Sequence, residues 1–145
     1  MPERETIERA REDKREGKSP TTQAGEFVRE EMHHVREGKH GARSTKQAIA
    51  IGLSKARRAG VDLPPPKKGK ASKETRKQAA RDLRKGKSKK KSEKRSRAML
   101  KKLKGEGHSA ASKTALSRHA RSAAAKRSAV SRSRSAKKAA KTRKK

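Results

Sequence analysis

Apolar residues recur at helical spacing most clearly between residues 21 and 63. In the first part of this region, four of them lie at positions i, i+4, i+8 and i+11, namely Ala24, Val28, Met32 and Val35. A helix places these four residues on one stripe, with Phe27 beside it. Thr21 or Thr22 can cap the start of this helix, and Gly38 can end it. The pattern therefore predicts a helix over TQAGEFVREEMHHVREG.

A second helix is predicted to begin at Ser44, which has the spacing of a capping box with Gln47. Its apolar residues at i, i+4 and i+7 are Ile49, Leu53 and Ala56. Gly60 is placed to end the helix in a Schellman motif, which brings Val61 against Ala56. The three prolines at 64–66 exclude a continuation, because proline has no N–H group. Residues 22–60 therefore predict an antiparallel helical hairpin, joined by the short loop GKHGAR.

The flanking segments have much weaker apolar patterns. Residues 1–20 form a densely charged N-terminal segment, for which a solvated, fraying helix is expected. The hairpin module, at 21–63, is followed by a Pro/Lys linker at 64–72 and by basic helical segments at 73–130. Serines can cap these helices, at Ser72, Ser92 and Ser112. The low-complexity basic tail at 131–145 is expected to be disordered.

The composition limits how much of the chain can form a core. Of the 145 residues, 42% are charged and 27% are hydrophobic, and Phe27 is the only aromatic residue. Large apolar side chains supply most of the stabilisation of a core, at about 1.5–3 kcal/mol each. With so few of them, the predicted fold class is all-α, with a small helical hairpin and a largely disordered or conditionally helical basic arm.

The charge is strongly asymmetric. Residues 1–66 contain 14 Lys or Arg and 11 Asp or Glu, whereas residues 67–145 contain 32 and 4, so the net charges are +3 and +28. Such asymmetry points to a polyanionic partner, nucleic acid above all. Single-strand binders stack bases on aromatic side chains, whereas the one aromatic residue here, Phe27, is expected in the core of the hairpin. We therefore expect duplex DNA as the partner, with RNA as the alternative.

The candidate nucleic-acid contacts are basic residues of the second helix and of the arm. Those of the helix, which we also consider as an element for a DNA groove, are Lys55, Arg57 and Arg58. Those of the arm are Lys67, Lys68, Lys70, Lys85, Lys87, Lys89, Lys90, Lys91, Lys101, Lys102, Arg132, Arg134, Lys137, Lys138, Lys141, Arg143, Lys144 and Lys145.

Residues that suggest catalysis or metal binding are few. The chain has no cysteine, no phosphate-binding glycine fingerprint and no Ser-His-acid arrangement. Three of its five histidines lie within eight residues, so His33, His34 and His40 are candidate metal ligands together with Glu30 or Glu37. Adjacent helical residues point about 100° apart, and no known ligand spacing is present. We therefore expect no metal, no cofactor and no catalytic residues, and not an enzyme.

The lack of recognisable targeting signals also favours an intracellular protein. The N-terminal segment has no apolar stretch of a secretory signal, and no apolar run approaches the roughly 20 residues that a membrane span needs. The expected location is the cytoplasm, at the nucleoid, without membrane association.

The second predicted helix reads KQAIAIGLSKAR from Lys46 to Arg57, and it follows Met32, Gly38 and Lys39. With these residues, the chain over about 24–62 resembles a family of small, basic bacterial proteins of unassigned function. Some of them carry labels such as plasmid-stabilisation or DNA-binding protein. The resemblance implies such a role here, and it supplies no catalytic residues. The tail is similar to linker-histone tails in composition.

The sequence therefore favours a non-enzymatic protein that binds duplex DNA without sequence specificity, of the nucleoid-associated type, through its basic C-terminal half. The first alternative is a plasmid-stabilisation or adaptor protein whose hairpin binds a protein partner. The second is an RNA- or ribosome-associated basic protein. The hairpin at 22–60 is also a candidate surface for homo-oligomerisation, because two helices alone form a small core.

Overall fold

Helices α2 (Pro20–Arg36) and α3 (Thr45–Arg58) form an antiparallel pair at the centre of the computed structural model, which describes residues 1–86 and 92–143. Ala24 shares one buried cluster with Ala56, and Met32 shares another with Ala48. Between these pairs, Gly52 lies against the backbone of α2 at Val28. The absence of a side chain at Gly52 lets the two helices approach closely. The predicted hairpin at 22–60 is therefore present.

The ends of this pair agree with the sequence pattern at three of four positions. Ser44 accepts a hydrogen bond from the Gln47 backbone N–H at 3.2 Å. Gly60 and Val61 form the predicted Schellman motif, because their N–H groups donate to Arg57 O and Ala56 O at 3.1 and 3.0 Å. Gly38, with φ of 74°, follows the end of α2.

The start of α2 differs from the prediction. Its N-cap is Ser19, whose hydroxyl accepts from the Thr22 N–H, and Pro20 is the first helical residue. Proline suits that position, since its missing N–H would have no partner in the first turn. The predicted caps at Thr21 and Thr22 are therefore wrong by two or three residues.

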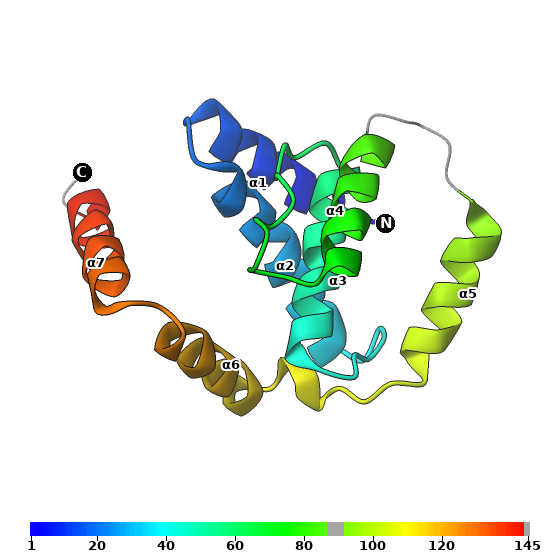
Figure 1. Cartoon of the computed structure of the whole chain (residues 1–145). Coiled ribbons are helices and arrows are strands. Elements are labelled where there is room, and N and C mark those ends of the chain that lie inside the picture. Colours follow the sequence, from blue (N-terminus) through cyan, green and yellow to red (C-terminus); the bar gives the residue numbers. More distant parts are fainter. Residues whose placement is uncertain (87–91, 144–145) are drawn as a thin grey trace.

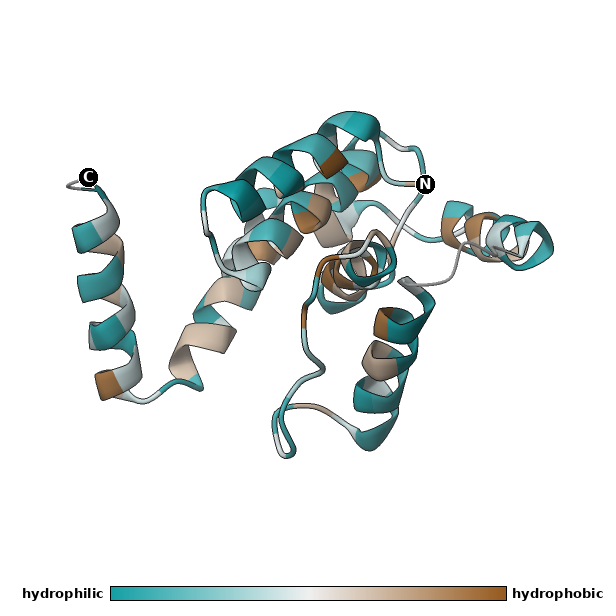
Figure 2. Ribbon diagram, turned by 90° about the horizontal axis from the view of Figure 1, so that it is seen from above, coloured by the Kyte–Doolittle hydropathy of each residue, from teal (hydrophilic) through white to brown (hydrophobic). Residues whose placement is uncertain are grey.

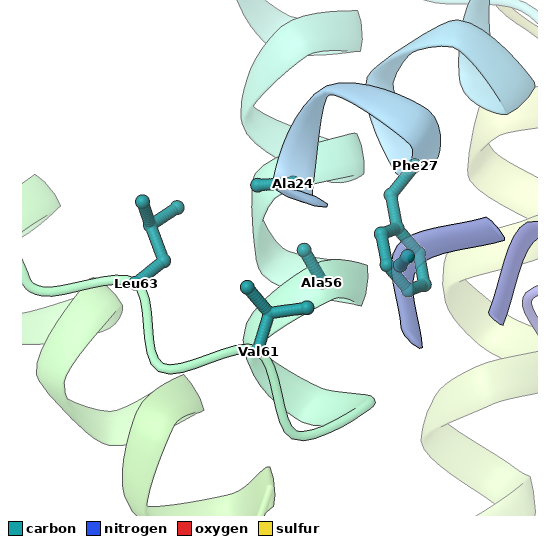
Figure 3. Close-up of a cluster of buried hydrophobic side chains, with 6 residues drawn as sticks. Ala24, Phe27, Ala56, Val61 and Leu63 are labelled. Atoms are coloured by element: carbon teal, nitrogen blue, oxygen red, sulfur yellow. The ribbon is translucent and has the colours of Figure 1, made fainter. Parts of the chain in front are cut away.

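Helix α1 (Arg4–Arg15) covers one side of the pair. Ala10 is buried and Ile7 packs against the first core cluster, which consists of Ala10, Ala24, Phe27, Ala56, Val61 and Leu63. In Figure 3, Phe27 comes from α2, while Val61 and Leu63 come from the segment after α3. The N-terminal segment is thus a helix with a buried face, and one aromatic ring anchors this cluster.

Helix α4 (Lys73–Gly86) covers α3 on its other side (Figure 1). Ala79 and Asp82 are its buried residues. At its end, the backbone of Gly86 lies so close to the Arg57 carbonyl that a side chain at Gly86 would collide with it. Helix α3 therefore lies between α2 and α4.

A second core cluster joins the hairpin loop to a distant segment of the chain. It consists of Met32, Val35, Ala42, Ala48, Ala110 and Ala111. The last two belong to η1 (Ser109–Ala111), a single 3-10 turn. Backbone N–H groups of Gly41 and Ala42 donate to Leu103 O at 2.8 Å and to Gly107 O at 2.9 Å. A side chain at Gly41 would collide with the Glu106 carbonyl, so this joint depends on a glycine.

Three further helices extend from this bundle. They are α5 (Glu93–Lys104), α6 (Lys113–Ala125) and α7 (Ala129–Arg143). Figure 1 shows α5 on one side of the bundle and α6, followed by α7, on the other. Leu103 is the buried residue of α5, and α6 and α7 contain none. In Figure 2, hydrophilic residues alternate with less polar ones along α7, the helix beside the C-terminus.

The predicted fold class is therefore wrong in its second half. The chain is all-α, but it is a bundle of helices and not a hairpin with a largely disordered or conditionally helical arm. Residues 129–143, predicted to lie mostly in a disordered tail, form α7. The prediction counted large apolar side chains, whereas alanines and close glycine contacts build much of this core. The division of the chain into domains stays a prediction.

No helix in the described residues is long and apolar enough to cross a membrane.

Candidate functional site

The exposed cations of the arm form the first candidate site. Twelve of the basic residues predicted as contacts are described there and all are exposed: Lys67, Lys68, Lys70, Lys85, Lys101, Lys102, Arg132, Arg134, Lys137, Lys138, Lys141 and Arg143. Six of them lie on α7, which buries no residue. The predicted contacts Lys87, Lys89, Lys90, Lys91, Lys144 and Lys145 lie outside the described residues.

These cations have almost no carboxylate partners within the chain. Over residues 67–86 and 92–143, Arg97 is the only lysine or arginine in an ion pair, with Glu93 at 3.4 Å. The arm has four acidic residues. One of them, Asp82, is bound to Arg58 of α3. The positive charge of the arm is therefore left for solvent ions or for a polyanion.

The predicted contacts on α3 have intramolecular partners instead. Lys55 Nζ lies 2.6 Å from Oε2 of the buried Glu31. Arg57 is 6% exposed and donates to the carbonyls of Leu63 and Pro64 at 3.0 and 3.3 Å. Burial lowers the pKa of Arg57, and the charge of Asp82 opposes this shift.

Arg58 donates to Asp82, which also accepts from Ser54 Oγ at 2.7 Å and from Gln78 Nε2 at 3.1 Å. Burial raises the pKa of Asp82, but the hydrogen bonds from Ser54 and Arg58 outweigh it and leave this pKa lowered. Because α2 and α4 cover α3 and its cations hold these contacts, we leave Lys55, Arg57 and Arg58 out of the candidate interface. A groove-reading role for α3 stays a prediction, with α2 and α4 packed against this helix.

A second candidate site is a buried group of glutamates and histidines at the loop end of α2. Ligand atoms of Glu31, His34 and His40 lie within 4.8 Å of one another, and all three residues are buried. His40 Nε2 is 3.2 Å from Glu31 Oε1, while Nδ1 of the same ring is 3.1 Å from the Gly41 carbonyl oxygen. The loop thus brings His40 back onto α2.

A neighbouring group shares His34. Its members Glu3, Glu30 and His34 also offer ligand atoms within 4.8 Å of one another. His34 Nε2 lies 3.0 Å from Glu3 Oε1 and 3.7 Å from Glu30 Oε1. Hydrogen bonds from His34 and Lys39 lower the pKa of Glu3 to about 2. A shallow depression beside this group is lined by residues that include Arg9, Arg29 and His33.

The structure therefore separates the histidines that the sequence placed together. His34 and His40 converge, whereas the exposed His33 belongs to neither ligand group, and Glu37 forms an ion pair with Lys39. Glu31 was missed. One signal was available: Glu31 falls on the apolar stripe, seven residues after Ala24 and four before Val35. A carboxylate at such a position is expected to be buried with a specific partner.

One family model matches part of the chain. Residues 15–68 match the model of DUF6496, a family of unknown function. The DUF6496 segment contains α2, the hairpin loop and α3, and with them Glu31, His34 and His40. Helices α4–α7 lie beyond it. No curated protein and no solved structure matches the chain.

Proposed function

We propose that the chain is a non-enzymatic protein that binds duplex DNA without sequence specificity, of the nucleoid-associated type, through the exposed cations of its C-terminal half. The observation that supports this proposal is the absence of carboxylate partners for the described cations of the arm, apart from Arg97. Such a density of positive charge is far above what solubility needs. Phosphate groups supply the missing anions, and the released counterions favour binding.

The contacts of this proposal are to the DNA backbone. Lysine and arginine side chains on exposed helices bind phosphate oxygens without reading bases. Half of the described cations of this interface lie on α7, where Arg132, Arg134, Lys137 and Lys138 are exposed along the middle of the helix. Affinity should therefore fall steeply as salt is raised, by about 10³–10⁵ between 50 and 200 mM if 6–10 phosphates are bound.

The test replaces charges and leaves the chain at full length, because residues 103–111 complete the core. In the α7 variant, Arg132, Arg134, Lys137 and Lys138 are changed to Gln. Anisotropy of a short labelled duplex should show affinity reduced at least about tenfold at low salt, with a slope of log K against log salt that is less negative by up to about 3–4.

The matched control changes four exposed cations of α1 that form no ion pair in the described structure: Arg4, Arg11, Lys14 and Arg15. It alters the net charge equally, but α1 lies outside the proposed interface, so the slope should stay near that of the parent. If both variants lost the same amount of affinity, the loss would follow from net charge alone, and the proposed interface on α7 would be wrong. An α7 variant with unchanged affinity and slope would contradict the proposal. Duplex RNA as competitor separates DNA from RNA.

A further inference from the structure

We propose that Glu31, His34 and His40 form a binding site for a divalent transition-metal ion such as Zn²⁺, with Glu30 beside it. This inference is independent of DNA binding. It starts from the spacing Glu31-x-x-His34 on α2, which places both side chains on the same face of the helix. The loop then adds His40, and the ligand atoms of the three lie within 4.8 Å of one another.

The hydrogen bond of His40 determines which ring nitrogen can bind a metal. Nδ1 lies 3.1 Å from the Gly41 carbonyl oxygen, which can only accept, so Nδ1 carries the proton. In a neutral ring, Nε2 then carries a lone pair, which faces Glu31 Oε1 at 3.2 Å. A cation between these two groups removes their repulsion. A histidine that donates one N–H to a backbone carbonyl and binds metal with the other nitrogen is the usual arrangement.

The distances suit a small metal ion. With metal–ligand bonds of about 2.0–2.1 Å, the ligands of a tetrahedral site lie about 3.4 Å apart. The separation of 3.2 Å between His40 Nε2 and Glu31 Oε1 is close to this value. Two imidazoles with carboxylates favour Zn²⁺ or a similar first-row ion over Ca²⁺ or Mg²⁺, which take oxygen ligands.

The buried carboxylates are the second observation that points to a cation. Glu31 is 0% exposed and Glu30 4% exposed. Oε2 of Glu30 has no hydrogen-bond partner, and the partners of Glu31 are the Lys55 ammonium, 2.6 Å from Oε2, and the His40 ring, 3.2 Å from Oε1. Glu30 Oε1 accepts from the Glu3 N–H at 3.0 Å and lies 3.7 Å from His34 Nε2. Among the described lysines and arginines, Lys55 alone pairs with either of these buried carboxylates. Buried charges without hydrogen bonds are costly unless they are paired or coordinate a metal.

Bound metal would connect α2 with the hairpin loop. The same loop holds the arm, because the Gly41 N–H donates to Leu103 O. The ion would thus stabilise the joint between the DUF6496 segment and the residues that follow it. Its expected effect is structural, with a rise in thermal stability on loading.

The experiment titrates the metal-free full-length chain with Zn²⁺ in a calorimeter. One ion per chain should bind, and the melting temperature should rise by about 5–10 °C at a hundredfold excess over Kd. His40→Asn keeps a donor near Nδ1 but removes Nε2, and should weaken zinc binding by at least about tenfold, as should His34→Asn. The control His119→Asn changes a histidine on α6 and should bind zinc like the parent.

A measurement on the unmodified chain does not depend on whether the variants fold. Zinc should shift the imidazole NMR signals of His34 and His40 and leave those of His119 in place. The proposal is overturned if zinc shows no saturable binding, or if all histidines respond alike. It is also overturned if the proton on Nε2 of His40 persists at saturating zinc, because His40 is then an imidazolium paired with Glu31.

Discussion

The Arg58 guanidinium of α3 donates two hydrogen bonds to Oδ1 of Asp82 in α4, from Nε at 3.0 Å and from Nη2 at 2.8 Å. The Asp82 side chain is 2% exposed, whereas that of Arg58 is 51% exposed. The pair joins the last helix of the DUF6496 segment to the first helix beyond it. It is therefore a sensitive point for testing whether α4 belongs to the folded bundle.

Asp82→Ala should destabilise the protein by about 2–3 kcal/mol, because Ser54, Arg58 and Gln78 all lose their acceptor. Urea denaturation monitored by circular dichroism measures the change. Glu74→Ala removes an exposed carboxylate in the first turn of the same helix and should cost less than about 1 kcal/mol. Equal effects of the two substitutions would mean that α4 does not depend on the contact with α3.

Acid should weaken the same contact. Since the pKa of Asp82 is lowered in the folded protein, its contribution to stability is complete above the ordinary value of 3.8 and is lost as the pH falls below it. The difference in unfolding free energy between the parent and Asp82→Asn should therefore shrink between about pH 6 and pH 3. Denaturation at the two pH values measures it, and a difference that stays constant would contradict the assignment.

Two glycines of the hairpin should respond to alanine in opposite directions. At Gly52, an added Cβ would lie 2.7 Å from Val28 Cα, so Gly52→Ala should push α2 and α3 apart and destabilise by about 1–3 kcal/mol. At Gly25 nothing lies within 4 Å of an added Cβ, and Gly25→Ala should stabilise by about 0.5–1 kcal/mol through helix propensity. Thermal melting of both variants tests the pair. A stable Gly52→Ala protein would show that the helices have room.

Truncation should distinguish the parts of the arm that belong to the core. A chain that ends at residue 112 keeps Ala110 and Ala111 over the second cluster, and its bundle should bind little of a dye that reports exposed apolar surface. A chain that ends at residue 86 loses this cover. It should bind the dye and melt at a lower temperature. Equal melting temperatures of the two chains would contradict the packing of η1.

Local signals explain why the hairpin was predictable. The cap at Ser44 and the Schellman motif at Gly60 are specified by a few neighbouring residues, and the apolar stripe selects the buried face of α2. Start signals beyond the hairpin were also readable, since Ser92 and Ser112 cap α5 and α6 as predicted. Each of these features depends on contacts within a single helix and its ends.

The long-range contacts were not predictable from such patterns. Ala110 and Ala111 are small residues of high helix propensity, and nothing near them indicates that they cover a cluster with Met32 and Val35. The approach of His40 to His34 and Glu31 is a similar case, because the path of the loop from Gly38 to Gly41 brings His40, and not His33, to Glu31. Glycines permit such close contacts between backbone segments, but the sequence does not show which segment each glycine contacts.

The two portions of the arm differ in how they are attached. Helix α5 is held to the bundle at its C-terminal end, where Leu103 is buried and its carbonyl accepts from the Gly41 N–H. Helix α6 contacts η1 and α3, with Leu116 against the second cluster, whereas α7 buries no residue. At about 1.5 Å per residue, each of these two helices is roughly 20 Å long. A polyanion bound by α7 can therefore lie well away from the bundle, yet it stays at a high effective concentration for the cations of α5 and α4.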